Sequence, residues 1–245
     1  MSSSNVKTIL PVNVTSFWIF GYGSLCWNPG FTFKQSCIGY VKGFCRKFWQ
    51  GSISHRGTKT EPGRVATLIE DEMAVVWGRA FEITSESDSF RYLQTRECSN
   101  GGYLPEMVTF YPTDDTNSSS VQAITFIAYS DNCFWLGDAP LMEISSQISR
   151  TKGIAGHNAE YLLKLADYIR KYIPQDQDDE LFALEILVLE QLKRQKLNLN
   201  DVMVMDNRSG VELEEQIIQS TIAEPRSSDD FTHRVPDKKL RCVNI

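Results

Sequence analysis

The chain has 245 residues, of which 42% are hydrophobic and 23% charged, and this is the composition of a globular protein with a sizeable core. Its net charge is −6, from 25 basic and 31 acidic side chains, and its short basic clusters do not predict a nucleic-acid partner. No apolar run approaches the roughly 20 residues of a membrane span, and the first residues lack the pattern of a secretory signal.

The cysteines are widely spaced and include no Cys-x-x-Cys pair, so the sequence predicts no metal site. Without a secretory signal, we expect the reducing cytosol, where disulfides are rare. A monomer is the default expectation. The cysteines are Cys26, Cys37, Cys45, Cys98, Cys133 and Cys242.

The first half of the chain is rich in β-forming residues. Residues 1–16 are polar and Ser-rich, and we expect them to form a flexible arm. The pair Asp71-Glu72 separates two apolar runs and predicts a hairpin between them. Dense in Val, Ile and aromatic residues, the predicted strands lie near 17–20, 36–52, 64–70, 74–83, 105–112 and 121–130.

The second half changes to a helical period. Asp138 is expected to cap a helix that carries Leu141, Ile144 and Ile148, and Asn158 to cap another that stops before Pro174. A third helix is predicted through Leu181, Leu184, Val188 and Leu192. Strands followed by helices indicate an α+β fold. Beyond Leu197 the apolar density falls, so disorder is the default for 197–245, with a short helix over 211–222 as the alternative.

Glu97 is the most informative single position. The segment 87–97 has the pattern of a helix in which Phe90, Leu93 and Glu97 share one face. A carboxylate thus extends an apolar stripe near the C-terminal end of the helix, where burial and the helix dipole would both raise its pKa. An acid/base catalyst needs such a group. The alternative is an ion pair with Arg91 or Arg96, which the pattern alone favours.

Two further segments suit ligand binding. The turn Tyr22-Gly23-Ser24-Leu25 follows an apolar strand and could present backbone N–H groups to an anion or a polarised carbonyl, although it could equally be a turn without a ligand. The stretch 46–57 mixes aromatic, amide and cationic side chains, which suits a zwitterionic or carboxylate ligand, or else a twisted strand with exposed arginines.

The histidines and Cys98 have to be weighed against these residues. His55 and His157 lack metal-ligand spacing, so surface or capping roles are expected for both. Cys98 directly follows Glu97 and could act as a thiol nucleophile, but no histidine is placed beside it by the sequence.

Taken together, YGSL, FWQGS-x-x-HRGT-x-x-x-PGRV and RE-x-x-x-GGY resemble the ChaC-like, glutathione-specific γ-glutamylcyclotransferases over residues 17–196. The resemblance implies a small mixed β-barrel packed by helices as the catalytic domain, with 197–245 as a C-terminal extension. Three features depart from the family pattern. Leu104-Pro105 follows Gly-Gly-Tyr where an aspartate is common, Asn117–Ser120 suggests a longer hairpin, and the extension has no recognised counterpart.

The resemblance also implies roles for particular residues. The turn Tyr22, Gly23, Ser24 and Leu25 is expected to hold a γ-glutamyl group, and Glu97 to act as general acid/base. Tyr103 and Tyr161 are expected to contact the substrate, and Gln50 and Arg56 are weaker carry-overs. This implication overturns the ion-pair reading of Glu97 as its sole role.

The implied reaction cyclises the γ-glutamyl group of glutathione and releases 5-oxoproline and cysteinyl-glycine, without a cofactor. The α-amine attacks the γ-carbonyl, so the protein mainly has to hold a folded conformer and move a proton. The cysteinyl-glycine end is expected near Gln50–Arg56. Three alternatives stay open at this point: other γ-glutamyl amino acids or amines as substrates, a non-catalytic binding protein on the same scaffold, and a cysteine hydrolase that uses Cys98.

Overall fold

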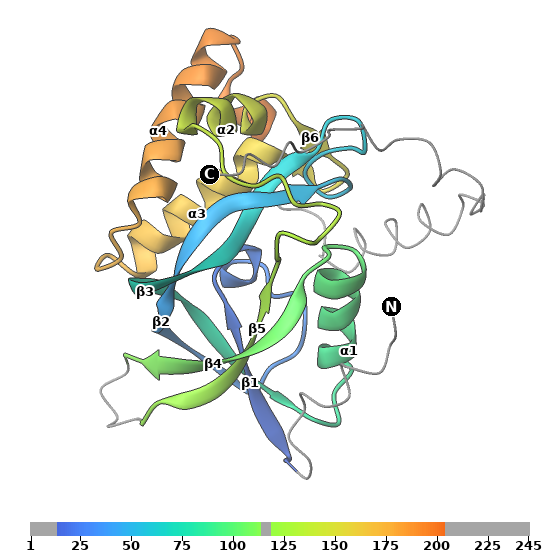
Figure 1. Ribbon diagram of the computed structural model, residues 1–245, viewed down its shortest axis with the longest axis vertical. Coiled ribbons are helices and arrows are strands. Elements are labelled where there is room, and N and C mark those ends of the chain that lie inside the picture. Colours follow the sequence, from blue (N-terminus) through green and yellow to red (C-terminus); the bar gives the residue numbers. More distant parts are fainter. Residues whose placement is uncertain (1–13, 114–118, 204–245) are drawn as a thin grey trace, which may run out of the picture.

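The computed structural model describes residues 14–113 and 119–203. Within these ranges, five strands close into a barrel in the order β1-β3-β2-β4-β5, where β1 and β5 pair in parallel and the other neighbours are antiparallel. This mixed barrel, packed by helices, confirms the predicted α+β class (Figure 1). The barrel strands are β1 (Ser16–Gly21), β2 (Gln35–Ser52), β3 (Gly63–Thr84), β4 (Leu104–Pro112) and β5 (Val121–Ile127).

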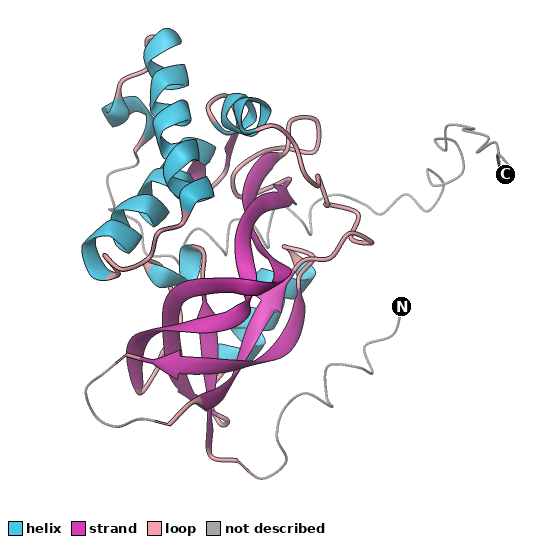
Figure 2. Cartoon of the chain, turned by 60° about the vertical axis from the view of Figure 1, so that its left-hand side comes forward, coloured by secondary structure: helices cyan, strands magenta, loops and turns pink. Residues whose placement is uncertain are grey.

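The longer helices gather at one end of the strands β2 and β3, whereas α1 lies beside the barrel (Figure 1). Figure 2 shows the same separation of barrel and helices from a second direction. None of the described helices is long and apolar enough to cross a membrane. The helices are α1 (Ser89–Leu93), α2 (Leu141–Ile148), α3 (Asn158–Tyr172), α4 (Asp179–Arg194) and α5 (Leu199–Val202), with short strands β6 (Lys152–Gly153) and β7 (Gly156–His157), a 3₁₀ turn at Ser24–Cys26 and a π-helical turn at Gln94–Ser99.

The hairpin expected at Asp71-Glu72 is wrong. β3 is one strand, and both of its halves run antiparallel to β2, with Phe44 opposite Glu70 and Lys42 opposite Val75. The four residues 71–74 are therefore extra residues opposite Gly43, whose φ of +84° lets β2 bend at the bulge. A polar pair between apolar runs is compatible with either a hairpin or a bulge, and the shared partner strand decides for the bulge.

Two predicted helix caps are displaced. α2 begins at Leu141 with Pro140 as its N-cap instead of Asp138, and the N-cap of α3 is His157, one residue before Asn158. The Asn158 side chain instead bonds the backbone of Arg64, accepting from its N–H at 2.6 Å and donating to its carbonyl at 2.8 Å. These contacts join positions 94 residues apart, so local capping preference could not reveal them.

The apolar positions predicted for the three longer helices form much of the core. The larger buried cluster joins the barrel interior to α2, α3 and α4, and a second cluster packs α1 against β1 and β3. Leu93 in the second cluster is fully buried, so core packing holds the helix four residues before Glu97. Phe20, Phe48, Leu165 and Leu184 belong to the larger cluster, and Ile19, Phe81 and Ile124 to the second.

The boundaries 1–16, 17–196 and 197–245 stay a prediction. Val202 on α5 is 1% exposed and belongs to the larger cluster, so packed structure reaches at least that residue. Residues 204–245 of the extension, with the alternative helix over 211–222, lie outside the described residues, as do residues 1–13 of the expected arm. The expected hairpin at Asn117–Ser120 is described only at its flanks, where Phe110 of β4 pairs with Val121 of β5.

Candidate active site

A single cavity brings the predicted residues together. Its volume is about 150 Å³, comparable to an engineered cavity that holds one benzene molecule, so it has room for a ligand group of that size. The turn after β1, the start of the chain after β2, the π-helical turn and α3 all contribute to its wall. The predicted site residues that line it are Tyr22, Gly23, Ser24, Leu25, Arg56, Glu97, Tyr103 and Tyr161.

Glu97 reaches this cavity from an irregular helix. The predicted helix begins at Ser89, after Asp88, and continues beyond Leu93 as the π-helical turn Gln94–Ser99. Single π-helical turns are frequent at functional sites. The Glu97 side chain is 16% exposed, and its Oε1 lies 3.1 Å from Nε of Arg96. The ion pair with Arg96 and a position in the cavity therefore coexist, although the sequence suggested them as alternatives.

Arg96 also connects the segment that carries Glu97 to the glycine turn and the residues just after it. Its Nη1 donates to the carbonyls of Asn28 and Pro29, both at 3.0 Å, and its Nη2 donates to Oγ of Ser24 at 2.9 Å. One guanidinium thus spans from the acid/base candidate to the glycine turn. The sequence named Arg96 only as a partner of Glu97.

The glycine turn has backbone donors to offer. The N–H groups of Gly23, Ser24 and Leu25 make no hydrogen bond to another described residue, while the carbonyls of Gly23 and Ser24 accept from the residues that follow. A Cβ at position 23 would lie 2.7 Å from Oη of Tyr161, so any larger residue would have to displace this hydroxyl. The turn and Tyr161 therefore line the same cavity, and the turn carries backbone N–H groups without a partner among the described residues.

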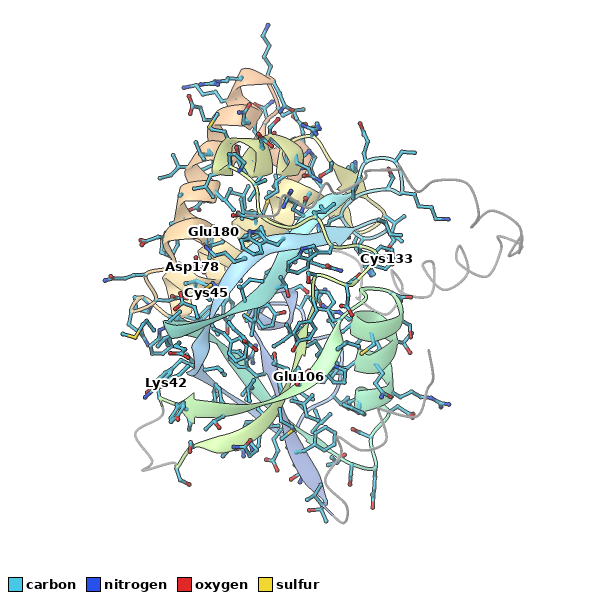
Figure 3. The ribbon with its side chains drawn as sticks, viewed as in Figure 1. Lys42, Cys45, Glu106, Cys133, Asp178 and Glu180 are labelled. Atoms are coloured by element: carbon cyan, nitrogen blue, oxygen red, sulfur yellow. The ribbon has the colours of Figure 1, made fainter. Side chains whose placement is uncertain are left out.

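A buried arginine holds this turn from behind. Arg46 is 3% exposed and donates from Nε to the carbonyl of Tyr22 at 2.9 Å and from Nη2 to that of Trp77 at 2.6 Å. Its Nη1 pairs with Asp178, whose side chain also caps α4 through the N–H of Leu181. Figure 3 places Asp178 and Glu180 at the start of α4, beside β2. A charged residue inside an apolar β-rich run was the only sequence signal for Arg46.

Asp176 lies near the same guanidinium, with Oδ2 at 3.7 Å from Nη1 of Arg46. That oxygen is buried and lacks a hydrogen-bond partner among the described residues. Burial, helped by the charge of Asp178 and opposed by Arg46, raises the pKa of Asp176 to about 6. The second acid of this cluster is thus only weakly stabilised as an anion.

The three predicted tyrosines that line the cavity differ in how their hydroxyls are used. Tyr22 donates to the carbonyl of Phe126 at 2.5 Å, and Tyr103 donates to that of Ala66 at 2.7 Å. Tyr161 instead accepts from the N–H of Ala66 at 3.2 Å, so its own hydrogen stays available for a ligand.

Tyr161 keeps that hydrogen at neutral pH. Burial, helped by the charge of Glu97 and opposed by the Ala66 N–H and Arg46, raises the pKa of its hydroxyl to about 12. The hydroxyl is therefore a neutral hydrogen-bond donor in the cavity.

Gln50 does not line the cavity. Its side chain is fully buried and donates from Nε2 to the carbonyl of Gly101 at 2.7 Å, which fixes the loop after Glu97. Gln50 therefore supports the loop after Glu97 without lining the cavity itself. A direct role of Gln50 in substrate binding stays a prediction.

The two histidines behave differently. His157 caps α3, with Nδ1 accepting from the N–H of Ala159 at 3.1 Å, as expected. His55 was expected to have a surface or capping role, and this is wrong, because it lines the cavity. Burial lowers the pKa of His55 to about 4, with Arg96 and Arg56 adding to the effect, so the imidazole is neutral at physiological pH.

Cys98 is poorly placed as a nucleophile. It does not line the cavity, and burial, followed by the charge of Glu97, raises the pKa of its thiol to about 12. The thiolate that a cysteine hydrolase needs is therefore scarce at neutral pH. Among residues 14–113 and 119–203, no group of three or more His, Cys, Asp or Glu side chains could hold a metal ion.

Comparisons with known proteins show the family of this chain. The profile of the ChaC-like protein family matches residues 17–191. Glutathione-specific γ-glutamylcyclotransferase 1 of Danio rerio is 48% identical over 73% of this chain and 92% of its own length, and that of Homo sapiens is 44% identical over 69% and 77%. A crystal structure of a glutathione-specific γ-glutamyl cyclotransferase from yeast superimposes with a TM-score of 0.64 at 26% identity, covering 73% of this chain and 97% of that one. The chain therefore belongs to the ChaC-like protein family.

Proposed function

We propose that this protein is a glutathione-specific γ-glutamylcyclotransferase that converts reduced glutathione into 5-oxoproline and cysteinyl-glycine. The named activity of its relatives in the ChaC-like family supports the reaction. One observation carries the assignment of the site: Glu97 lines the same cavity as the Tyr22–Leu25 turn. We further propose a cytosolic monomer without a nucleic-acid or membrane partner.

In the proposed mechanism, Glu97 moves protons from the attacking nitrogen to the departing nitrogen. The α-ammonium of the substrate is mostly protonated at neutral pH, so Glu97 first removes a proton from it. The free amine then attacks the γ-carbonyl carbon, and a C–N bond closes the five-membered lactam. As the amide bond to cysteine breaks, Glu97 returns this proton to the departing nitrogen. It then carries the second proton of the attacking nitrogen to the same amine, so the lactam keeps one N–H and cysteinyl-glycine leaves as an ammonium. No water, oxidant or cofactor enters this balance.

The ion pair with Arg96 suits this role. It holds the carboxylate of Glu97 at the cavity, with Oε1 3.1 Å from Nε of Arg96. The same Arg96 bonds Ser24, so the base and the glycine turn keep a fixed spacing. Since both reacting groups belong to one substrate molecule, most of the rate enhancement would come from holding the folded conformer.

The donors around the cavity would stabilise negative charge. The amides of Gly23, Ser24 and Leu25, together with the Tyr161 hydroxyl, could bind the γ-oxyanion or grip the α-carboxylate. Tyr22 and Tyr103 give their hydrogens to backbone carbonyls, so they can offer a substrate only an acceptor or an apolar surface.

A direct test incubates the full-length protein with reduced glutathione and follows both products by mass spectrometry, beside Glu97→Gln. Wild type should release 5-oxoproline and cysteinyl-glycine in equal amounts, and the variant should lose turnover while retaining substrate binding. Substantial turnover by a folded Glu97→Gln protein would contradict the assignment. A panel of γ-glutamyl amino acids and γ-glutamylamines distinguishes a glutathione-specific enzyme from one that also acts on other γ-glutamyl compounds.

A further inference from the structure

Every nitrogen of the Arg46 guanidinium donates to a fixed acceptor. Nε donates to the carbonyl of Tyr22 at 2.9 Å, Nη2 to that of Trp77 at 2.6 Å, and Nη1 to Oδ2 of Asp178 at 2.5 Å. The Arg46 side chain is fully buried and does not line the cavity. A planar guanidinium with three fixed acceptors has one orientation, so Arg46 holds the Tyr22 carbonyl in a single direction.

The peptide unit that Arg46 binds also carries the N–H of Gly23. The described chain has no cis peptide bond, and in a trans unit the C=O and the N–H point in opposite directions. Because the Tyr22 oxygen is held toward Arg46, the Gly23 N–H is directed away from Arg46. Gly23 lines the cavity, and its N–H makes no hydrogen bond to another described residue. Arg46 therefore sets the direction of an unused donor at the cavity wall.

The contact also strengthens that donor. A cation that binds a carbonyl oxygen draws electron density from the peptide unit, and hydrogen bonds linked in this way polarise one another. A Cβ at position 23 would lie 2.7 Å from Oη of Tyr161, so the peptide unit and this hydroxyl are neighbours. Burial raises the pKa of the Tyr161 hydroxyl and Arg46 opposes that shift, so the guanidinium charge acts on the cavity wall from behind it.

Arg46 is itself anchored to helix α4. Asp178 accepts from Arg46 and, through Oδ1, from the N–H of Leu181 as the N-cap of α4. Asp178 and Asp176 both lie at Nη1, so the two acids leave the Nε–H for Tyr22. Leu181 is fully buried in the larger core cluster. Core packing thus fixes the guanidinium before a ligand binds, and such preorganisation lowers the entropic cost of binding.

We infer that Arg46 is a positioning residue for the reaction: it aims and polarises the Gly23 N–H, so that this donor stabilises negative charge on the substrate. This inference rests on the proposed function and adds to it a residue that lies outside the cavity lining. A lysine at this position would keep the charge, but its ammonium is a single point and cannot hold all three acceptors in fixed directions. Arg46→Lys therefore keeps a partner for Asp178 and loosens the Tyr22–Gly23 peptide unit.

The experiment compares Arg46→Lys with Arg64→Lys in the full-length protein. Arg64 is a matched control, because it is 6% exposed, donates to the carbonyls of Phe48 and Gly137, and does not line the cavity. Both variants should lower Tm to a similar extent. Only Arg46→Lys should lower kcat/KM for glutathione, by roughly 10- to 100-fold, the loss typical of removing a group that orients a ligating residue.

The peptide unit provides a readout that a loss of stability alone would not move. A carbonyl carbon resonance shifts when its oxygen loses a hydrogen bond, so the carbonyl resonance of Tyr22 and the amide nitrogen resonance of Gly23 should move in Arg46→Lys and stay in Arg64→Lys. If Arg46→Lys does not fold, Arg46→Gln combined with Asp178→Asn removes the ion pair as a unit and keeps a capping side chain for α4. This double variant should show the same loss of kcat/KM.

Two results would overturn the inference: equal losses of kcat/KM in Arg46→Lys and Arg64→Lys, or a Tyr22 carbonyl resonance that Arg46→Lys leaves unchanged. Absence of 5-oxoproline with the wild type would instead refute the proposed function. The two failures are therefore distinguishable, because the first requires a wild type that turns over glutathione.

Discussion

Two tyrosine hydroxyls meet at Ala66, and replacing each by phenylalanine separates support of the fold from support of the reaction. Tyr103 donates to the Ala66 carbonyl, and Tyr161 accepts from the Ala66 N–H. Each substitution leaves one buried backbone group without this partner, which costs about 1–3 kcal/mol. For a chain of this size that lowers Tm by roughly 2–4 °C per kcal/mol, so both variants should stay folded at 25 °C.

The two variants should differ in turnover. Only the Tyr161 hydroxyl has a hydrogen to give to the substrate, and loss of one donor to a developing oxyanion costs up to about 10²–10³ in kcat. Tyr161→Phe should therefore lose activity beyond its effect on stability, mildly if the hydroxyl meets only the α-carboxylate. Tyr103→Phe should retain most of its kcat.

The assay pairs steady-state kinetics on glutathione with thermal unfolding of both proteins, at a temperature well below either midpoint. Equal stability losses with unequal kcat/KM are the expected result. If Tyr161→Phe keeps wild-type kcat/KM, the hydroxyl has no part in the site. If both variants lose activity in proportion to their stability, the assignment of donor and acceptor roles is refuted.

Other perturbations test neighbouring parts of the structure. Gly23→Ala places a Cβ 2.7 Å from the Tyr161 hydroxyl and should raise KM for glutathione. Adding Tyr161→Phe removes that hydroxyl and should relieve part of the defect. Strictly additive losses in the double variant would contradict the clash. Asp176 has a folded pKa of about 6, above its usual 3.8, so its charge weakens the fold above pH 6 and the penalty fades as pH falls toward 4. Asp176→Asn should thus raise the free energy of unfolding by the order of 2–3 kcal/mol at pH 7.5 and by less at pH 5, and urea titrations showing no gain at pH 7.5 would oppose this. Cys98→Ser should retain turnover, and an inactive but folded variant would revive the cysteine-hydrolase alternative.

Much of the fold could be predicted because the spacing of apolar residues along the chain is a local property. Strand-like runs and helical spacing placed the main elements near their observed positions, and the order of strands before helices indicated the α+β class. Local signals failed where a distant partner competed. Asp71-Glu72 became a bulge because both halves of β3 pair with β2, and Asn158 bonds Arg64 rather than capping α3.

By itself, the sequence determined the resemblance to a family and identified the glycine turn and Glu97 as candidate site residues. These are short contiguous motifs, so neighbouring residues are enough to recognise them. Only the tertiary structure decided that Glu97 pairs with Arg96 and still lines the cavity, that His55 faces inward, and that Arg46 holds the turn. The reason is distance along the chain: Arg46 and Asp178 are 132 residues apart. A contact of that kind depends on how barrel and helices pack, which no local pattern encodes.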